Sequence, residues 1–286
     1  MSMMNGNAKP ALRLLAFFAH PDDEVFSCGG VMALNRQRGI HNTLVCATKG
    51  EAGEISSPEL ADPSNLGAVR EQELLEAARH MGVDDLYFLG YRDSGMAGTP
   101  ENQHPAAYAN ADPSAVVPRL VRFIRTVQPQ VVITFDPTGG YGHPDHIAIH
   151  KHALTAFSAA ADPAFAPELG APWQAQRLFY PSFRREIFVE LANQLEAQGI
   201  EPPEWSNEEE GFQERPIHAG VDVSAVSTAK WTAFKSHRTQ FGPNHPFLVV
   251  PEEFILKLLS TEWFELAWPE NKPQQLYTDL FEGLAL

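Results

Sequence analysis

Two apolar runs, far apart in the sequence, each lead into a cluster of histidine and acidic residues. The run at residues 12–18 precedes Ala19–Glu24 (AHPDDE), and the run at residues 131–135 precedes Gly142–His146 (GHPDH). Runs of this length, rich in branched and aromatic residues, are typical of buried strands in a parallel sheet. The carboxyl ends of such strands lie at one edge of the sheet, where α/β proteins bind their ligands. We therefore expect the two clusters to meet at that edge and to form a metal site.

Strand-like and helix-like segments alternate through the first two-thirds of the chain. The expected strands are 11–19, 43–48, 85–89, 131–136 and 177–182, and the expected helices are 24–38, 67–81, 114–127 and 145–160. This alternation predicts an α/β fold with a Rossmann-like, mostly parallel sheet, flanked by helices and joined by right-handed crossovers.

The rest of the chain predicts a C-terminal α+β extension. A strand near 219–223, helices at 224–238 and 251–260 and a strand at 263–267 follow an exposed loop expected at 200–215. Residues 90–112 lack periodicity and follow a predicted strand, so they are expected to line the rim of the site. We expect a single domain over residues 1–286, in which 1–183 form the core with the metal site and 184–286 complete the substrate pocket.

Composition narrows the classes of partner. The formal net charge of −15 argues against nucleic acid, because a phosphate backbone needs a positive protein surface. No run approaches the roughly 18 apolar residues that span a membrane, and the first ten residues lack the apolar stretch of a secretory signal. Cys28 and Cys46 do not suggest a disulfide framework and are expected to be buried. We expect a cytoplasmic protein with a small-molecule substrate and no nucleic-acid or membrane partner, with homo-oligomerisation left open.

The first cluster carries ligand types that suit a borderline cation. Imidazole and carboxylate groups, here His20, Asp22 and Asp23, bind zinc and related metals. Adjacent carboxylates cannot easily point the same way, so one could bind metal while the other faces a reacting water. An isolated aspartate in such a turn is more often a helix cap. Here three acidic groups, Asp22, Asp23 and Glu24, exceed what a helix start requires.

The second cluster strengthens the metal interpretation. It contains His143, Asp145, His146 and His150, and the last two histidines share one helix face. An isolated histidine-rich turn is commonly incidental, whereas two such clusters at two strand ends favour a metal site. His150 is expected on the helix surface or behind the ligands rather than among them.

With these motifs the sequence resembles the PIG-L/LmbE-like zinc deacetylases. The resemblance covers residues 12–160 and includes Thr48–Glu51, Arg70–Glu71 and Gly90–Met96. The last stretch, together with Gly98–Pro100 and Gly140–His143, resembles the branch that deacetylates N-acetylglucosaminide precursors of the thiol cofactors mycothiol and bacillithiol.

The resemblance implies a role for each candidate residue. It implies zinc, or Fe(II) on the same ligands, bound by His20, Asp23 and His146. It implies Asp22 as general base, and His143 as the charged partner of the tetrahedral intermediate and a proton donor. Asp145 would orient His143, and Tyr141 would be a mobile oxyanion contact. Substrate contacts are implied for Arg70, Asp93, Glu51 and His237, the last at the site rim.

The chemistry of amide hydrolysis is consistent with these roles. Three protein ligands leave a zinc position open for water, and zinc lowers the pKa of that water to about 7. The oxyanion needs nearby donors and the leaving amine needs a proton, so both a base and an acid are required. We expect a metal-dependent N-deacetylase acting on a small N-acetylglucosamine conjugate, linked to inositol or to malate.

Two other functions are compatible with parts of the pattern. A non-haem Fe(II) oxygenase also binds its metal with two histidines and a carboxylate, although its usual scaffold is all-β. A metal-dependent sugar-binding module without turnover would not need both Asp22 and His143. Structural alternatives are a helix-surface role for Arg70, a turn role for Asp93, packing for Tyr141, capping for Glu51 and a helix-end role for His237.

Overall fold

The computed structural model describes residues 12–203 and 215–284. One seven-stranded sheet runs through it in the order β3-β2-β1-β4-β5-β7-β6. The strands are β1 Arg13–Phe18, β2 His41–Cys46, β3 Asp85–Phe88, β4 Val131–Ile133, β5 Arg177–Ser182, β6 Ala219–Asp222 and β7 Thr261–Trp268. The five strands from β3 to β5 pair in parallel, and β7 and β6 continue the sheet antiparallel. The predicted Rossmann-like fold and its α+β extension are therefore confirmed.

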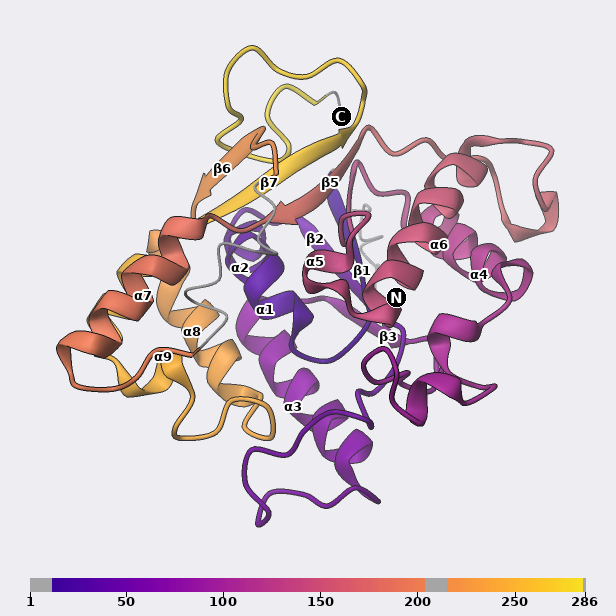
Figure 1. Ribbon diagram of the computed structural model, residues 1–286. Coiled ribbons are helices and arrows are strands. Elements are labelled where there is room, and N and C mark those ends of the chain that lie inside the picture. The colour runs from indigo at the N-terminus through magenta and orange to yellow at the C-terminus, as the bar shows by residue number, and fades with distance from the viewer. Residues whose placement is uncertain (1–11, 204–214, 285–286) are drawn as a thin grey trace, which may run out of the picture.

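Helices cover both faces of this sheet (Figure 1). The helices are α1 Asp23–Ser27, α2 Gly29–Gln37, α3 Leu66–Met81, α4 Pro113–Val127, α5 Gly139–Gly142, α6 Pro144–Ala161, α7 Arg185–Ala197, α8 Ser227–Ser236, α9 Pro246–Val249 and α10 Glu252–Leu258. The pair α4 and α6 packs together on one face, and α2, α3 and α8 pack on the other. Among the described helices, none is both long enough and apolar enough to cross a bilayer.

The strands β1 and β4 lie side by side at the centre of the sheet. Leu14 pairs with Val131 and Ala16 with Ile133. Residues 14–18 and 131–133 are completely buried, as expected for central strands with helices on both faces. This pairing brings the residues after Phe18 and the residues after Ile133 to the same edge of the sheet, as the sequence predicts.

Four local features differ from expectation. The helix expected at 24–38 is two helices, because Cys28 has an extended φ of −158° and breaks the helical path between α1 and α2. Strand β4 ends at Ile133 rather than at 136, because the chain turns there toward the site. Helix α7 is an addition, and it buries only Leu191, Ala192 and Leu195. Two 3₁₀ turns, Glu101–Gln103 and Tyr108–Asn110, interrupt the predicted loop at 90–112.

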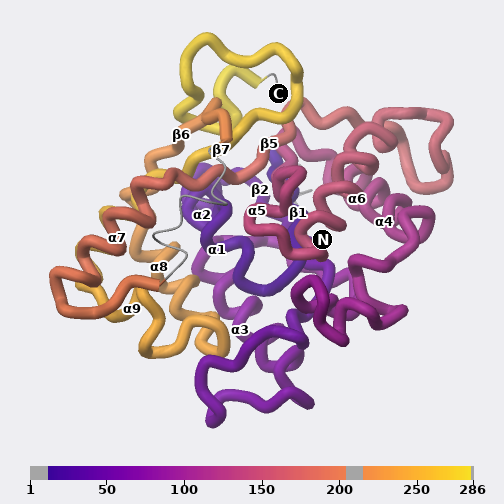
Figure 2. The backbone as a smooth tube through the Cα atoms, viewed as in Figure 1, coloured from indigo at the N-terminus to yellow at the C-terminus, as the bar shows by residue number. Residues whose placement is uncertain are grey.

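The C-terminal third is joined to the core through β7 and α8. Strand β7 pairs with β5, and α8 packs against α3 and α1. The smooth trace in Figure 2 shows this late segment running beside α1–α3, which come from the start of the chain. Most of the exposed loop predicted at 200–215 lies outside the described residues.

Candidate active site

Two histidines from the two sequence clusters face each other at the carboxyl edge of the sheet. Nδ1 of His20, after β1, lies 3.1 Å from Nε2 of His146 at the start of α6. The carboxylate of Asp23 adjoins both rings, with Oδ1 at 3.2 Å from His146 Nε2 and Oδ2 at 3.8 Å from His20 Nδ1. Two rings and one carboxylate thus converge on a single buried point.

The hydrogen bonds around these rings fix which nitrogens carry hydrogen. His146 Nδ1 lies 3.1 Å from the Gly139 carbonyl oxygen, so it is the donor and Nε2 presents a lone pair. His20 Nε2 lies 3.2 Å from Asp145 and 3.5 Å from Asp93, which only accept, so His20 Nδ1 also presents a lone pair. Lone pairs of two imidazoles and a carboxylate repel one another unless a cation or an added proton lies between them. The donor set therefore fits a borderline cation such as zinc or Fe(II).

Two further compact groups share His20, and one of them contains Asp93 and Asp145. The carboxylate of Asp93 already accepts backbone N–H groups from Gly95 at 2.8 Å and Ala52 at 3.1 Å. Asp145 accepts the backbone N–H of Ser94 at 2.9 Å and also its hydroxyl. These carboxylates are thus held by donors of their own, and they are well placed to orient the His20 ring from behind. The other group combines His20 and His146 with His143.

The electrostatic field at the paired histidines and Asp23 stabilises the charged forms of these groups. Burial by itself lowers the pKa of His20, but the neighbouring carboxylates, Asp93 foremost, outweigh it and hold that pKa well above its usual range. Burial by itself raises the pKa of Asp23, yet His146 and His20 bring it below its usual range. Each shift reflects carboxylates and imidazoles that stabilise each other's charged forms in a place with little water.

Asp22 occupies a strained position beside this group. Its φ of 109° lies in the left-handed region, which residues with a Cβ rarely adopt. Its side chain is 20% exposed, and Oδ2 accepts a hydrogen bond from Arg70 at 3.1 Å. Burial raises the pKa of Asp22 to about 6, with Arg70 opposing the rise and Asp23 adding to it. A carboxylate with this pKa can accept a proton near neutral pH.

Arg70 is a buried residue rather than a helix-surface residue. It is 3% exposed and donates to the carbonyl oxygens of Gly50 at 2.8 Å and Pro21 at 2.6 Å, in addition to Asp22. Gly50 has a φ of +67°, and a Cβ there would lie 2.3 Å from the Arg70 guanidinium. The loop after β2 therefore needs glycine at this position to let its backbone approach the arginine.

His143 caps α6 and is held by the main chain. Its Nδ1 accepts the backbone N–H of Asp145 at 3.1 Å, so the neutral ring carries its hydrogen on Nε2. Burial, together with His20 and His146, lowers the pKa of His143 to about 4. His143 is thus a neutral N–H donor near pH 7 rather than a charged group. Its hydrogen bond with Asp145 runs through the backbone, while the Asp145 carboxylate contacts His20 and Ser94.

Tyr141 is exposed, whereas Glu51 is half-buried. Tyr141, on the glycine-rich α5, is 69% exposed, and its ring centroid lies 5.0 Å from that of His146. Gly139 at the start of α5 leaves no room for a Cβ, which would approach His146 Cβ to 2.8 Å. Within the described part of the chain, Oε2 of Glu51 is buried and has no hydrogen-bond partner.

His237 does not lie at the rim where the sequence placed it. Its side chain is fully buried, and Nε2 lies 2.7 Å from Oε1 of Glu24. The imidazole lies between α1 and α8, so the structure does not bring it to the rim. The motif-like spacing at residues 236–240 reflects internal packing instead.

Two supporting residues had no predicted role. Ser94 is fully buried and holds both oxygens of Asp145. The ring of Phe135 stacks on His146 with centroids 3.9 Å apart, and its carbonyl oxygen accepts from His150 Nδ1 at 2.8 Å. The sequence placed Phe135 inside the predicted strand at 131–136, and nothing in the sequence paired Ser94 with Asp145.

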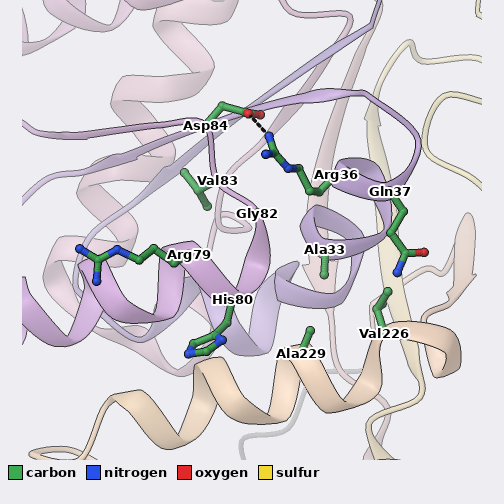
Figure 3. Close-up of a pocket in the computed structure, with 10 residues that line it drawn as sticks. All are labelled: Ala33, Arg36, Gln37, Arg79, His80, Gly82, Val83, Asp84, Val226 and Ala229. Atoms are coloured by element: carbon green, nitrogen blue, oxygen red, sulfur yellow. Dashed lines mark hydrogen bonds and ion pairs between the residues drawn. The ribbon is translucent and has the colours of Figure 1, made fainter.

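A separate hollow of about 510 Å³ lies at the opposite edge of the sheet. Figure 3 shows it between the ends of α2 and α3 and the start of α8, with Arg36 paired to Asp84. Its walls include Gly82 and Val83, which precede β3, so it faces the amino ends of the strands. None of the predicted site residues lines it.

Comparison with known proteins gives a consistent result. A family model described as PIG-L, GlcNAc-PI de-N-acetylase, matches residues 15–157. A 1D-myo-inositol 2-acetamido-2-deoxy-α-D-glucopyranoside deacetylase of Streptomyces scabiei is 37% identical over 95% of this chain and 90% of its own length. Among solved structures, N,N'-diacetylchitobiose deacetylase of Pyrococcus horikoshii has a TM-score of 0.62 at 22% identity, covering 89% of this chain and 83% of its own. The 4-carboxy-2-hydroxymuconate hydratase GalB of Pseudomonas putida has a TM-score of 0.57 at 19% identity, covering 92% of this chain and 98% of its own. The fold therefore accommodates more than one chemistry, and function must be argued from the site.

Proposed function

Because the chain belongs to the PIG-L family of de-N-acetylases, we propose that it removes the acetyl group from N-acetylglucosamine linked to inositol. The relative with 37% identity carries the name of that activity and is matched along nearly its whole length. The observation that carries the proposal is the convergence of His20, Asp23 and His146 beside Asp22 and His143. An oxygenase is disfavoured, since the scaffold is α/β rather than all-β.

We assign His20 Nδ1, the Asp23 carboxylate and His146 Nε2 as the metal ligands. Their lone pairs point to one place, and the hydrogen-bearing nitrogens point away to Asp145 and to the Gly139 carbonyl. A zinc or ferrous ion held there would acidify a bound water and polarise the acetyl carbonyl. The choice between the two metals follows from availability, because both accept this ligand set.

Asp22 is proposed as the general base. Its carboxylate is partly exposed, has a pKa of about 6 and is anchored by Arg70, so it is ionised and oriented near neutral pH. It takes a proton from the attacking water. When the C–N bond breaks, the same proton becomes available to the leaving amine, which satisfies the need for both base and acid.

His143 is proposed to stabilise the oxyanion as a neutral donor. Its Nδ1 is occupied by the Asp145 backbone N–H, so Nε2–H is free to donate to the developing negative charge. The hydroxyl of the exposed Tyr141 is a second candidate donor. This differs from the charged role expected for His143, because two neighbouring imidazoles and burial disfavour its protonation.

The substrate contacts divide into two groups. Glu51 remains a proposed contact, since its Oε2 has no partner in the described structure. Arg70 and Asp93, each 3% exposed, are better suited to hold Asp22 and His20 in place. We also propose that the core and the segment after residue 183 act as one domain, because β7 and α8 pack directly on core elements.

The test is release of free amine from three substrates: N-acetylglucosaminyl-inositol, N-acetylglucosaminyl-malate and N-acetylglucosamine. Chelated protein and protein restored with zinc or Fe(II) are compared. Metal-dependent amine release with the inositol conjugate preferred supports the proposal. Preference for the malate conjugate would keep the deacetylase and change the substrate. Metal binding without amine from any of them would overturn the proposed reaction.

A further inference from the structure

Asp22 is held by a buried pair of residues that come from opposite ends of the chain. One carboxylate oxygen of Glu24 accepts the backbone N–H of Asp22 at 3.0 Å. The other accepts from Nε2 of His237 at 2.7 Å. Glu24 is 1% exposed and His237 is fully buried, so the carboxylate bridges the two groups out of contact with water.

The backbone of Asp22 needs such support. Its φ of 109° and ψ of −23° place it in the left-handed region. For a residue with a Cβ this conformation is strained, and it persists only where surrounding contacts impose it. The bond from its N–H to Glu24 is one such contact, and the bond from its side chain to Arg70 is another.

His237 is itself held firmly by the segment that follows α8. Two residues on, Thr239 donates its backbone N–H to Glu73 of α3 at 2.9 Å and its hydroxyl to the same carboxylate at 2.5 Å. The carbonyl oxygen of Thr239 accepts from Ser56 N at 2.8 Å. The imidazole therefore projects from a segment that is tied to the core, and it can fix the position of Glu24.

We propose that Glu24 and His237 are positioning residues that keep Asp22 in the conformation in which it acts as general base. The proposal rests on the role of Asp22 in the proposed function. Neither residue makes a hydrogen bond or ion pair to His20 or His146 within the described structure. The pair should therefore affect turnover through Asp22 and leave metal binding intact. A poorly placed base can lower a rate by about 100-fold without a change in substrate affinity.

The experiment compares His237→Leu with His237→Gln and with Ser236→Ala. Leucine removes the donor, while the glutamine amide can place a donor close to the position of Nε2. Alanine at Ser236 removes only a hydroxyl that donates to the Thr232 carbonyl oxygen at 3.1 Å, so it controls for loss of a buried hydrogen bond in the same segment. Because His237→Leu leaves the Glu24 charge unpaired, the double variant Glu24→Leu/His237→Leu is included. Replacing both members of a buried pair by apolar groups commonly preserves folding.

Turnover, metal affinity and hydrogen exchange of the Asp22 amide are measured for each variant. We expect kcat to fall by about 10- to 100-fold in His237→Leu and in the double variant, with KM and metal affinity within about threefold. Exchange at Asp22 should accelerate in both, and His237→Gln should recover most of the loss. An equal loss of kcat in Ser236→Ala, or a parallel loss of metal, would overturn the proposal.

The exchange measurement also separates this inference from the proposed function. It needs no substrate, since it reports directly on the bond between Asp22 N–H and Glu24. If the wild-type protein releases no amine from any substrate, the proposed function fails on that result alone. Unchanged exchange at Asp22 in the double variant would overturn the positioning role whatever the substrate.

Discussion

His20 and His146 are 126 residues apart in sequence, and their ring nitrogens lie 3.1 Å from each other. The facing nitrogens are the two that lack a hydrogen in the neutral rings, because Asp145 and the Gly139 carbonyl bind the opposite sides. The protein thus orients both rings before any ligand binds. Such outer contacts are a general device for presenting imidazole to a metal.

Variants of the adjacent carboxylates Asp22 and Asp23 should separate metal binding from turnover. Asp22→Asn removes the base and is expected to lower kcat by about 10² to 10⁴-fold while one metal ion per chain is retained. Asp23→Asn weakens a proposed ligand and is expected to lower metal affinity first. Metal analysis after dialysis, together with amine release, distinguishes the two. Loss of metal in Asp22→Asn would show that the two roles are assigned the wrong way round.

Asp145 should control metal affinity through His20. Its carboxylate lies 3.2 Å from His20 Nε2 and is held by Ser94. Asp145→Asn is expected to weaken metal binding by about 10- to 100-fold, the usual effect of losing a partner of a ligating histidine. Ser94→Ala should cause a smaller loss in the same direction. Competition with a chromogenic chelator measures both, and equal affinities in all three proteins would contradict the assignment.

Gly50 should be intolerant of alanine because of Arg70. A Cβ at Gly50 would lie 2.3 Å from the guanidinium, whereas a Cβ at Gly90 would meet nothing within 4 Å. Both glycines have positive φ, +67° and +75°. Gly90→Ala therefore reports the backbone strain alone, on the order of 1 kcal/mol. Gly50→Ala should lose more stability in urea unfolding and should also lose turnover, and matching losses would show that Arg70 moves aside freely.

His245 should make the protein less stable as pH falls. Burial lowers the pKa of His245 to about 4, and its Nδ1 accepts the backbone N–H of Phe247 at 3.3 Å only in the neutral form. The unfolded chain takes up this proton near pH 6.5, so stability is lost as pH falls from about 6.5 toward 4. The contribution at pH 5 is about 1 to 2 kcal/mol, because part of the shift is screened at a partly exposed site.

The matched variant is His245→Asn, which can cap the same helix and does not titrate. Urea unfolding at pH 7 and pH 5 gives the comparison. The variant should lose less stability than the wild type between the two values, whatever its stability at pH 7. A pH dependence identical in both proteins would mean that His245 is not a source of acid sensitivity.

Much of the fold follows from patterns that are local in sequence. The apolar runs at residues 14–18 and 131–133 are fully buried. Such a run predicts a buried strand from its own residues, without knowledge of the rest of the chain. The meeting of the two histidine clusters follows from one further rule, the common edge of parallel strands. The break at Cys28 is different, because the backbone N–H groups of Gly30 and Val31 that follow it are held from across the fold by Glu262.

The chemistry of individual site residues was less predictable, because it depends on contacts between residues that are far apart in sequence. The neutral state of His143 depends on two other imidazoles brought close by folding, and the burial of His237 depends on α8 packing on α1. A motif indicates which residue types occur together in sequence. It does not indicate whether a side chain faces the ligand or a second side chain behind it, as Glu24 and His237 illustrate.

The pairing of β1 with β4 also determines the order of folding and metal binding. In the sequence, residues 23–130 lie between the two histidines and contain two strands and four of the helices. This segment must fold before the lone pairs of His20 and His146 can converge. Contacts of such long sequence separation form late, since the intervening chain must lose its freedom first. A newly made chain should therefore acquire its metal only after the parallel core has assembled. The bound ion would then stabilise the finished fold by mass action and would mark the end of its folding.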